Sequence, residues 1–328
     1  MSTLILQPPF LLSEREDALA CELFEQVFKH PNSLEQWRWK YQEGPRLCGV
    51  HVGIKSAQGQ LVAHAGASIF MGQYKNAQGN IKRLPMAQVC DVMVHESARE
   101  GVTHRGAYGQ LIHTLQEVLK QAYPGVYAYG FAGIRPYKLG LKMGMYKCHQ
   151  DCRMGQLQVM TAPTTHAPMR QELLQLESSE FLNYYGQFDE WAHAWGITDA
   201  PKILRTAAYL QWRFVQNPNA HYQFWLYPQA GEIRAWFVTR ELSPGHLTVV
   251  DALMHPSLQQ NLGQAIYQPH LFNQGINQGN SQTQSVASWY IQTQDSLKLE
   301  PIKACEVKVG QWHECKPPLF WPADTDVF

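Results

Sequence analysis

A segment rich in glycine and basic residues lies between a predicted strand and a predicted helix, over residues 91–111. Its members of interest are Arg99, Gly101, Thr103, His104, Arg105, Gly106 and Gly109. The free amides at the start of a helix bind phosphate oxygens, and glycine lets the backbone approach an anion closely. The segment therefore predicts a phosphate-binding loop, although many strand-to-helix loops carry Gly and Arg without a ligand.

Hydrophobic periodicity predicts the elements that hold this loop. A strand covers residues 83–94, and an amphipathic helix covers residues 106–121, where apolar side chains recur at helical spacing. The other elements predicted before residue 161 are helices at 14–29, 34–42 and 134–143 and strands at 48–55, 60–70, 126–131 and 146–160. Ser13 and Glu16 form a capping box that begins the first helix. Together they predict an α/β (α+β) fold with a mixed, mostly antiparallel sheet flanked by helices.

Three short matches between distant parts of the chain indicate an internal repeat. Residues 39–45 match 212–218 at an offset of 173, residues 59–63 match 231–235 at 172, and residues 89–95 match 249–255 at 160. The order of the matches is kept while the loops shorten, as expected for a duplicated domain. We therefore predict two copies of one domain, at residues 1–160 and 168–328, joined by a Pro- and Thr-rich linker.

The net charge of zero is a cancellation between two oppositely charged halves. Residues 1–160 hold 17 Lys and Arg against 12 Asp and Glu, whereas residues 161–328 hold 10 against 15. The whole chain of 328 residues therefore lacks the basic excess of a nucleic-acid coat, while the half with the predicted phosphate loop is basic. The seven cysteines are scattered without zinc-site spacing, and no apolar stretch is long enough to span a bilayer. We expect a cytoplasmic protein without a metal site.

Residues 99–109 resemble the pyrophosphate loop of the GNAT family of acyl-CoA-dependent N-acyltransferases, Arg/Gln-x-x-Gly-x-Gly/Ala. Arg105 and Gly106 occupy the last basic and glycine positions, and Thr103 stands where the first Arg or Gln is usual. Counted forward from the strand, Arg99 and Gly101 fill the early positions instead. The loop is about four residues longer than usual, so that the family motif is spread over its whole length.

A second stretch, residues 133–145, resembles the family pattern Asn-x-x-Ala-x-x-Leu-Tyr-x-x-x-Gly-Phe with its spacing intact. Leu139 and Gly144 match it, whereas Gly133, Pro136, Gly140 and Met145 replace the Asn, Ala, Tyr and Phe. The replaced tyrosine often protonates the departing thiolate in this family. Tyr137 and Tyr146 are the candidate substitutes, and each is equally consistent with an ordinary half-buried tyrosine.

The resemblance implies a tandem GNAT protein that binds acetyl-CoA or another acyl-CoA in its first copy only. The cofactor contacts it implies are Met93, Val94, Arg99, Gly101, Thr103, His104, Arg105, Gly106, Ala107, Tyr108 and Gly109. A backbone amide near Met93 and Val94, beside a bulge in the strand, would polarise the thioester carbonyl, and the acceptor would be a small-molecule amine or a peptide.

The remaining roles are assigned by position and by comparison of the two copies. Glu96 is the preferred general base among Glu96, Glu100, His95 and His104, because it follows the strand that should carry the acyl group. Trp37 is the candidate for the acceptor pocket, since its counterpart in the second copy is Leu210. Residues present in both copies, such as Trp39 and Asp91, are assigned to the fold.

Two other functions remain open at this point. Gly140 and the irregular loop suit a non-catalytic acyl-CoA-binding or regulatory protein. A Fem-type aminoacyl transferase also has paired GNAT-like domains and would not need the loop at Arg105 and Gly106.

Overall fold

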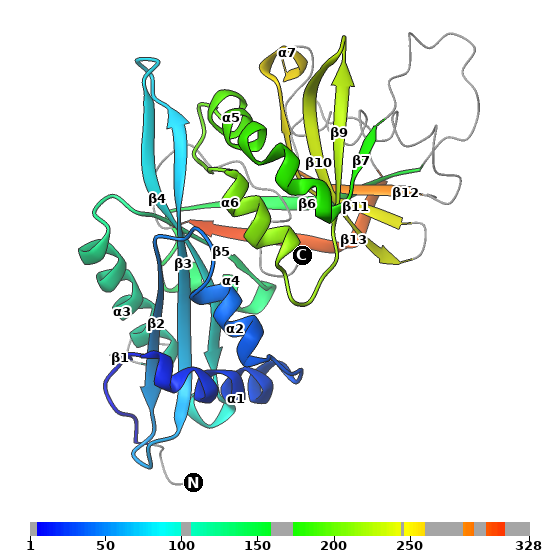
Figure 1. Ribbon diagram of the computed structural model, residues 1–328. Helices are drawn as coiled ribbons and strands as arrows, with labels where there is room; N and C mark the ends of the chain where they lie inside the picture. The colour runs from blue at the N-terminus through cyan, green and yellow to red at the C-terminus, as the bar shows by residue number, and fades with distance from the viewer. Residues whose placement is uncertain are drawn as a thin grey trace.

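The computed structural model describes residues 5–99, 106–158, 173–243, 246–259, 285–291 and 300–311. Within these residues the strands join into one sheet in the order β1-β2-β3-β4-β5-β13-β6-β12-β11-β10-β9-β7, and β8 pairs with β3 (Figure 1). The strands up to residue 158 are β1 (Phe10–Leu11), β2 (Cys48–Lys55), β3 (Leu61–Lys75), β4 (Ile81–Val94), β5 (Tyr127–Ala132) and β6 (Cys148–Gln158). The later strands are β7 (Leu174–Leu176), β8 (Lys202–Ile203), β9 (Gln223–Gln229), β10 (Glu232–Ser243), β11 (His246–Met254), β12 (Ser285–Ile291) and β13 (Glu300–Gln311).

The helices lie on the faces of this sheet. They are α1 (Asp17–Phe28), α2 (Leu34–Tyr41), α3 (Ala107–Ala122), α4 (Ile134–Lys142), α5 (Tyr185–Trp195), α6 (Ala207–Leu210) and α7 (Pro256–Gln259). Helix α3 packs on one face of β2 and β3, in a hydrophobic cluster that includes Val52 and Leu111. Helices α1 and α2 cover the other face, in a cluster that includes Leu23 and Trp37. The predicted mixed sheet flanked by helices is confirmed.

The strand order of the first half recurs in the second. Strands β2, β3 and β4 are antiparallel and β5 then runs parallel to β4, whereas β9, β10 and β11 are antiparallel and β12 runs parallel to β11. A bulge interrupts the register of β3 with β4 and of β10 with β11. Both halves therefore build the same arrangement of four strands.

The two halves share strands. Strand β13, from the end of the chain, lies between β5 and β6 and pairs antiparallel with both. Strand β6 in turn pairs antiparallel with β12 of the second half. The sheet therefore runs unbroken from one half to the other. The domain limits at residues 160 and 168 stay a prediction, because they fall outside the described residues.

The elements predicted in the first half are confirmed, with small shifts at their ends. The helix predicted at 14–29 begins with a single 3-10 turn, where the backbone N–H of Ser13 donates to Glu16 Oε2 at 2.8 Å, and continues as α1. Strand β3 runs five residues beyond its predicted end at Phe70, and with β4 it forms a long hairpin (Figure 1). The extension is polar in sequence, but Gln73 is buried and donates to the carbonyl of Ala192.

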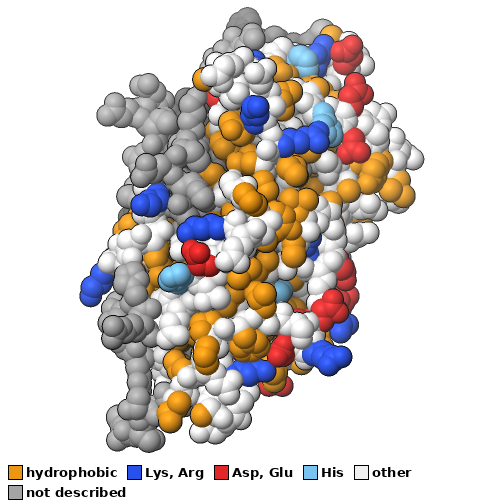
Figure 2. All heavy atoms as spheres, turned by 90° about the vertical axis from the view of Figure 1, so that its left-hand side faces the viewer, with side chains coloured by type: hydrophobic (Ala, Val, Ile, Leu, Met, Phe, Trp, Pro, Cys, Tyr) orange, Lys and Arg blue, Asp and Glu red, His pale blue; other side chains and the backbone are white. Residues whose placement is uncertain are grey.

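None of the described helices combines the length and the apolarity that a membrane span requires. On the face drawn in Figure 2, charged side chains of both signs lie around a central band of hydrophobic side chains. Acidic and basic groups are therefore interspersed on this face rather than separated.

Candidate active site

Strands β4 and β5 separate after a short parallel pairing, and a cavity opens at this point. The pairing runs from Met86 with Tyr127 to Val89 with Gly130 and ends there. The cavity has a volume of about 470 Å³. Its lining comprises Phe24, Phe28, His30, Asn32, Gln36, Trp39, Lys40, Gln88, Val89, Cys90, Asp91, Val92, Tyr108, Ile112, Gly130, Phe131, Ala132, Gly133, Pro136, Met145 and Tyr146.

A bulge in β4 forms the wall of this cavity. The register of β3 with β4 shifts between His64 opposite Met93 and Gly66 opposite Cys90, so that Asp91 and Val92 together oppose the single residue Ala65. Asp91 has a φ of 48°, in the left-handed region that Asp and Asn tolerate better than most other side chains. The predicted bulge is thus present, centred two residues before Met93.

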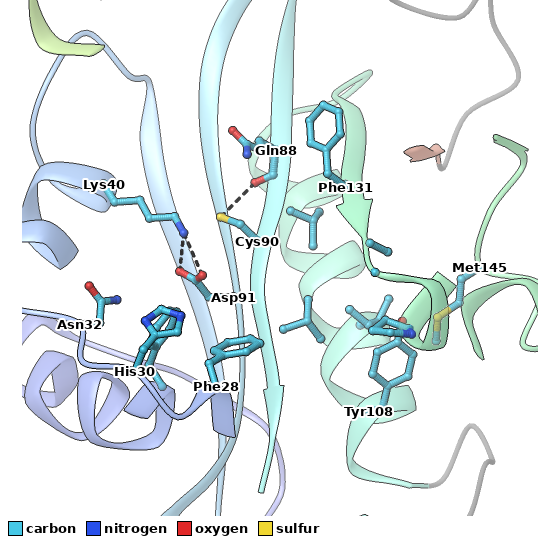
Figure 3. A pocket seen from close by; sticks show the side chains of 18 of the residues that line it. Phe28, His30, Asn32, Lys40, Gln88, Cys90, Asp91, Tyr108, Phe131 and Met145 are labelled. Carbon is cyan, nitrogen blue, oxygen red and sulfur yellow. Dashed lines mark hydrogen bonds and ion pairs between the residues drawn. The ribbon is translucent and has the colours of Figure 1, made fainter. Parts of the chain in front are cut away.

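The side chains around the cavity come from both faces of the sheet (Figure 3). Tyr108 of α3 and Met145 lie on one side of β4, whereas His30, Asn32 and Lys40 lie on the other, on α2 and the loop before it. A molecule bound from the α3 side and a second one bound from the α1–α2 side would therefore meet at the bulge.

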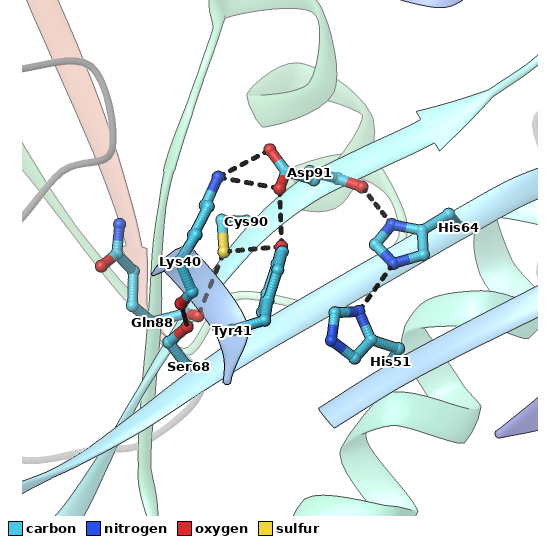
Figure 4. Close-up of polar contacts among 8 residues, drawn as sticks. All are labelled: Lys40, Tyr41, His51, His64, Ser68, Gln88, Cys90 and Asp91. Atoms are coloured by element: carbon cyan, nitrogen blue, oxygen red, sulfur yellow. Dashed lines mark hydrogen bonds and ion pairs between the residues drawn. The ribbon is translucent and has the colours of Figure 1, made fainter. Parts of the chain in front are cut away.

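A buried polar network holds the bulge in place (Figure 4). Lys40 Nζ donates to both carboxylate oxygens of Asp91 at 2.8 Å, and the Tyr41 hydroxyl donates to Oδ2 at 2.6 Å. The backbone carbonyl of Asp91 accepts from His64 Nδ1 at 2.8 Å. The side-chain carboxylate and the backbone carbonyl of Asp91 are therefore both held in place, since charge-assisted hydrogen bonds in a buried site are strong.

Two histidines, the buried His64 and the half-buried His51, lie next to the bulge as neutral groups. Burial lowers the pKa of His51 to about 3 and that of His64 to about 4. Because His64 Nδ1–H donates to a carbonyl, its Nε2 is free to accept from His51 Nδ1, which lies 3.1 Å away. This tautomer follows from the hydrogen-bond network. The pair positions the backbone of β4 without adding charge.

The start of α3 has the features expected of an anion site. Gly106 is the N-cap residue in an extended conformation, and the first turn of α3 contains no acidic residue. Ala107 and Gly109 are buried, and Tyr108 faces the cavity. The preceding residues Gly101, Thr103, His104 and Arg105 lie outside the described residues, whereas Arg99 is exposed and its Nε donates to the carbonyl of Val94 at 2.9 Å.

Tyr146 occupies the space that a side chain at position 140 would need. A Cβ built on Gly140 would lie 2.7 Å from Tyr146 Cζ and 2.9 Å from its hydroxyl oxygen. The ring of Tyr146 stacks on Tyr137 with centroids 5.8 Å apart, and its hydroxyl forms a hydrogen bond with Tyr108. Burial raises the pKa of Tyr146, so this phenol is neutral at ordinary pH. Glycine at position 140 therefore makes room for the ring of Tyr146.

The other residues predicted from sequence lie outside the cavity lining. Met93 and Trp37 are fully buried in the cluster under α1 and α2, where the Trp37 indole donates to Asp17 at 3.1 Å. Tyr137 is buried beneath Tyr146. Val94 is half-buried, and Glu96 is exposed on a 3-10 turn after β4. Of the predicted site residues within the described ranges, the structure brings only Tyr108 and Tyr146 to the cavity.

Several residues that line the cavity are not predicted from the sequence. Trp39 and Asp91 occur in both copies, which assigns them to the fold, yet both line the cavity. Asn32 and Lys40 line it as well, and neither belongs to a motif that points to a site. The sequence difference that marks this site is at position 32, where the first copy has Asn and the second has Arg205 at the offset of 173.

Comparison with known proteins defines the fold. No family model and no curated protein sequence matches the chain. Among solved structures, a probable N-acyltransferase of unknown function from Enterococcus faecalis matches with a TM-score of 0.60 and 15% identity, over 94% of this chain and 71% of that one. A GCN5-related N-acetyltransferase from Anabaena variabilis matches with a TM-score of 0.60 and 15% identity, over 93% and 72%.

Saccharomyces cerevisiae N-myristoyltransferase with bound myristoyl-CoA and inhibitors is also similar, with a TM-score of 0.53 and 12% identity, over 99% of this chain and 84% of that one. The chain therefore has the fold that these N-acetyltransferase and N-myristoyltransferase structures share. At these identities the likeness concerns the fold, while function depends on the site.

Proposed function

We propose that the protein is an acyl-CoA-dependent N-acyltransferase that moves an acyl group from acetyl-CoA or another acyl-CoA to an amine. The observation that carries this proposal is the cavity at the separation of β4 and β5, which is lined from both faces of the sheet. A thioester and an amine that enter from opposite faces meet at the bulge without competing for one entrance. Proteins of the same fold include an N-myristoyltransferase with bound myristoyl-CoA.

In the proposed reaction the amine nitrogen attacks the thioester carbonyl carbon. A C–N bond forms and the C–S bond breaks, while the amine loses one proton and the departing thiolate gains one. The enzyme aligns the two reactants and stabilises the oxyanion. We assign the oxyanion contact to a backbone amide of the bulged strand, in the stretch from Asp91 to Val94 that includes Met93.

The start of α3 is the proposed seat of the pyrophosphate. The amides of Ala107, Tyr108 and Gly109 are unpaired within the helix, because the first N–H groups of a helix have no carbonyl before them. We include Arg99, Gly101, Thr103, His104, Arg105 and Gly106 in this site on the family resemblance. Basic side chains here would neutralise the phosphates.

Tyr146 is the proposed hydrogen-bond donor to the sulfur. It lines the cavity, keeps its proton at neutral pH, and fills the space at Gly140 where the family carries its tyrosine. A neutral phenol stabilises the negative charge that develops on sulfur as the C–S bond breaks. Tyr137 supports the ring of Tyr146 from below. Glu96 is exposed, so a proton passing from the amine to Glu96 would travel through water.

Binding and turnover of acyl-CoA test the proposal. Calorimetry with coenzyme A should show saturable binding that Gly106→Glu abolishes, because a carboxylate would enter the phosphate site. Acetyl-CoA and longer acyl-CoAs, mixed with a panel of amines, should release free thiol. Tyr146→Phe should lower kcat about 100-fold with coenzyme A affinity unchanged, whereas Tyr74→Phe, in the β3–β4 hairpin, should have no effect.

The alternative functions give different results in the same experiments. Coenzyme A binding without thiol release from any amine would favour the non-catalytic acyl-CoA-binding protein. Coenzyme A binding that is absent, or unaffected by Gly106→Glu, would remove the proposed cofactor site. Either of these last two results would favour the Fem-type aminoacyl transferase, which does not need the loop at Arg105 and Gly106.

A further inference from the structure

The two halves of the chain cap their second helices in the same way. The hydroxyl of Ser33 accepts from the backbone N–H of Gln36 at the start of α2, and the hydroxyl of Thr206 accepts from the N–H of Tyr209 at the start of α6. Both pairs are related by the offset of 173 found in the sequence. The residues just before the caps, Asn32 and Arg205, are therefore structural counterparts.

In the second half this position carries a cation that is bound to the bulged strand. Arg205 Nε donates to Asp251 Oδ2 at 2.6 Å, and their side chains are only 5% and 0% exposed. Asp251 of β11 is the counterpart of Asp91 of β4. In the second half, the guanidinium of Arg205 thus fills the space beside the carboxylate of Asp251.

In the first half the counterpart of Arg205 is Asn32, which lines the cavity, while Lys40 binds the carboxylate of Asp91. Asn32 is shorter than arginine and uncharged, and it lines the cavity together with Asp91 (Figure 3). Asn32 Oδ1 is buried and has no hydrogen-bond partner within the described structure. A buried carbonyl oxygen without a donor is unfavourable, and a bound ligand with N–H groups would satisfy it.

The chemistry of this space favours a cation with several donors. Asn32 Oδ1 and the carboxylate of Asp91 are both acceptors, and a primary ammonium offers three N–H donors to them. Lys40 already balances the charge of Asp91, so the site attracts a single positive group less strongly than a free carboxylate would. The unsatisfied amide oxygen of Asn32 therefore supplies the direction, and Asp91 supplies a second acceptor rather than a net negative charge.

Three aromatic rings surround the α1–α2 side of the cavity. Phe24 contacts Phe28 and His30 at centroid distances of 4.7 Å and 4.9 Å, and Phe28 is 43% exposed although it is apolar. All three line the cavity with Asn32. Flat or apolar groups bind well against such rings, and a nearby ammonium gains from their faces.

We infer that the acceptor is a primary ammonium ion with an aromatic or apolar substituent, whose nitrogen binds where Arg205 places its guanidinium in the second half. Asn32 Oδ1 and Asp91 receive the ammonium, and Phe24, Phe28 and His30 receive the substituent. This inference rests on the proposed N-acyltransferase function and names the acceptor class of the same site.

Asn32→Arg tests the inference, because it introduces the arrangement that the second half already contains. The new guanidinium should occupy the ammonium position beside Asp91. With acetyl-CoA and 2-phenylethylamine as probes, the KM for the amine should rise about tenfold or more, while calorimetry shows unchanged coenzyme A affinity. Asn80→Arg, the same change in the exposed turn between β3 and β4, should leave the KM unchanged.

A second variant and a second probe keep the result interpretable. Asn32→Leu removes the amide oxygen at similar volume, and it should also raise the KM for 2-phenylethylamine. The uncharged 2-phenylethanol should not compete with the amine. An unchanged KM in both variants, or equal inhibition by the alcohol, would overturn the inference.

The failure of the proposed function has a separate signature. If wild-type protein does not bind coenzyme A, or binds it and releases no thiol with any amine, the proposed function fails and this inference fails with it. If thiol is released but neither variant changes the KM for the amine, only the acceptor assignment is wrong.

Discussion

Trp39 and Trp212 donate hydrogen bonds to each other's backbone carbonyls. Trp39 Nε1 lies 3.0 Å from the carbonyl oxygen of Trp212, and Trp212 Nε1 lies 2.9 Å from that of Trp39. Their rings stack with centroids 4.9 Å apart. The two residues are counterparts in the repeat, so this reciprocal pair joins equivalent positions of the two halves. Their cluster includes residues of both halves.

Loss of either indole should weaken the whole molecule. Trp39→Phe leaves the carbonyl of Trp212 buried without its donor, and we expect the free energy of unfolding to fall by about 2 to 4 kcal/mol. Trp212→Phe should act similarly, and the double variant should cost less than the sum, because both changes disrupt one contact. Urea denaturation measures these values. Trp191→Phe, at a half-buried tryptophan of α5, is the matched control, and an equal loss there would argue against a special role for the pair.

The packing of Gly140 against Tyr146 predicts a strong coupling between these positions. Gly140→Ala should lower the free energy of unfolding by about 1 to 3 kcal/mol, because its methyl group would overlap the Tyr146 ring. In a Tyr146→Ala background the same change should be neutral or stabilising, since alanine favours a helix. Thermal and urea denaturation of the four proteins test this. Additive effects would show that the two positions do not share one space.

The lowered pKa values of His51 and His64 predict that the protein loses stability in acid. The pKa values of His51 and His64 are depressed to about 3 and about 4, against about 6.5 in the unfolded chain. Protons therefore bind preferentially to the unfolded state as pH falls below 6.5. Each imidazole should remove about 2 kcal/mol of stability between pH 7 and pH 5.

A pair of substitutions isolates this contribution from that of other titrating groups. His51→Gln combined with His64→Gln should reduce the difference in unfolding free energy between pH 7 and pH 5. His113→Gln, on α3, is the control. A pH dependence equal to that of the wild type in the double variant would mean that the two imidazoles are not the groups responsible.

The Lys40–Asp91 ion pair should matter most when only one partner is removed. Lys40→Met leaves a carboxylate buried beside the Tyr41 hydroxyl, and we expect a loss of about 3 kcal/mol. Adding Asp91→Asn should restore much of the loss, because asparagine removes the charge and tolerates a positive φ. Urea denaturation distinguishes this recovery from simple addition of two losses. The exposed pair Lys120 and Glu117 serves as the control, with an expected cost below about 1 kcal/mol for Lys120→Met.

Local patterns were sufficient for most of the first half. The spacing of apolar residues in α3 and the alternation in β2 and β4 are properties of neighbouring residues, so their limits could be predicted within a few positions. The repeat could also be predicted, because Trp39 and Trp212 lie in short matching stretches. The bulge was expected near Met93, and its centre at Asp91 depends on pairing with β3.

The site was less predictable, since it depends on which side chains share one space. Tyr146 could be named as a substitute donor, but that Gly140 makes room for its ring follows only from their contact. Comparison of the copies assigns Asp91 to the fold, yet in the structure this carboxylate binds Lys40 of α2 and lines the cavity. Its counterpart Asp251 instead binds Arg205, which lies just before α6, and no local pattern encodes this difference.

By itself the sequence determined the elements of the first half and the short matching stretches of the repeat, because these are encoded in residues near one another along the chain. Only the tertiary structure decided that β13 inserts between β5 and β6 and that the cavity is lined from both faces of the sheet. It also showed that Asn32 and Asp91 line the same cavity. These relations join residues far apart in sequence, and they depend on hydrogen-bond pairing and packing that no local pattern encodes.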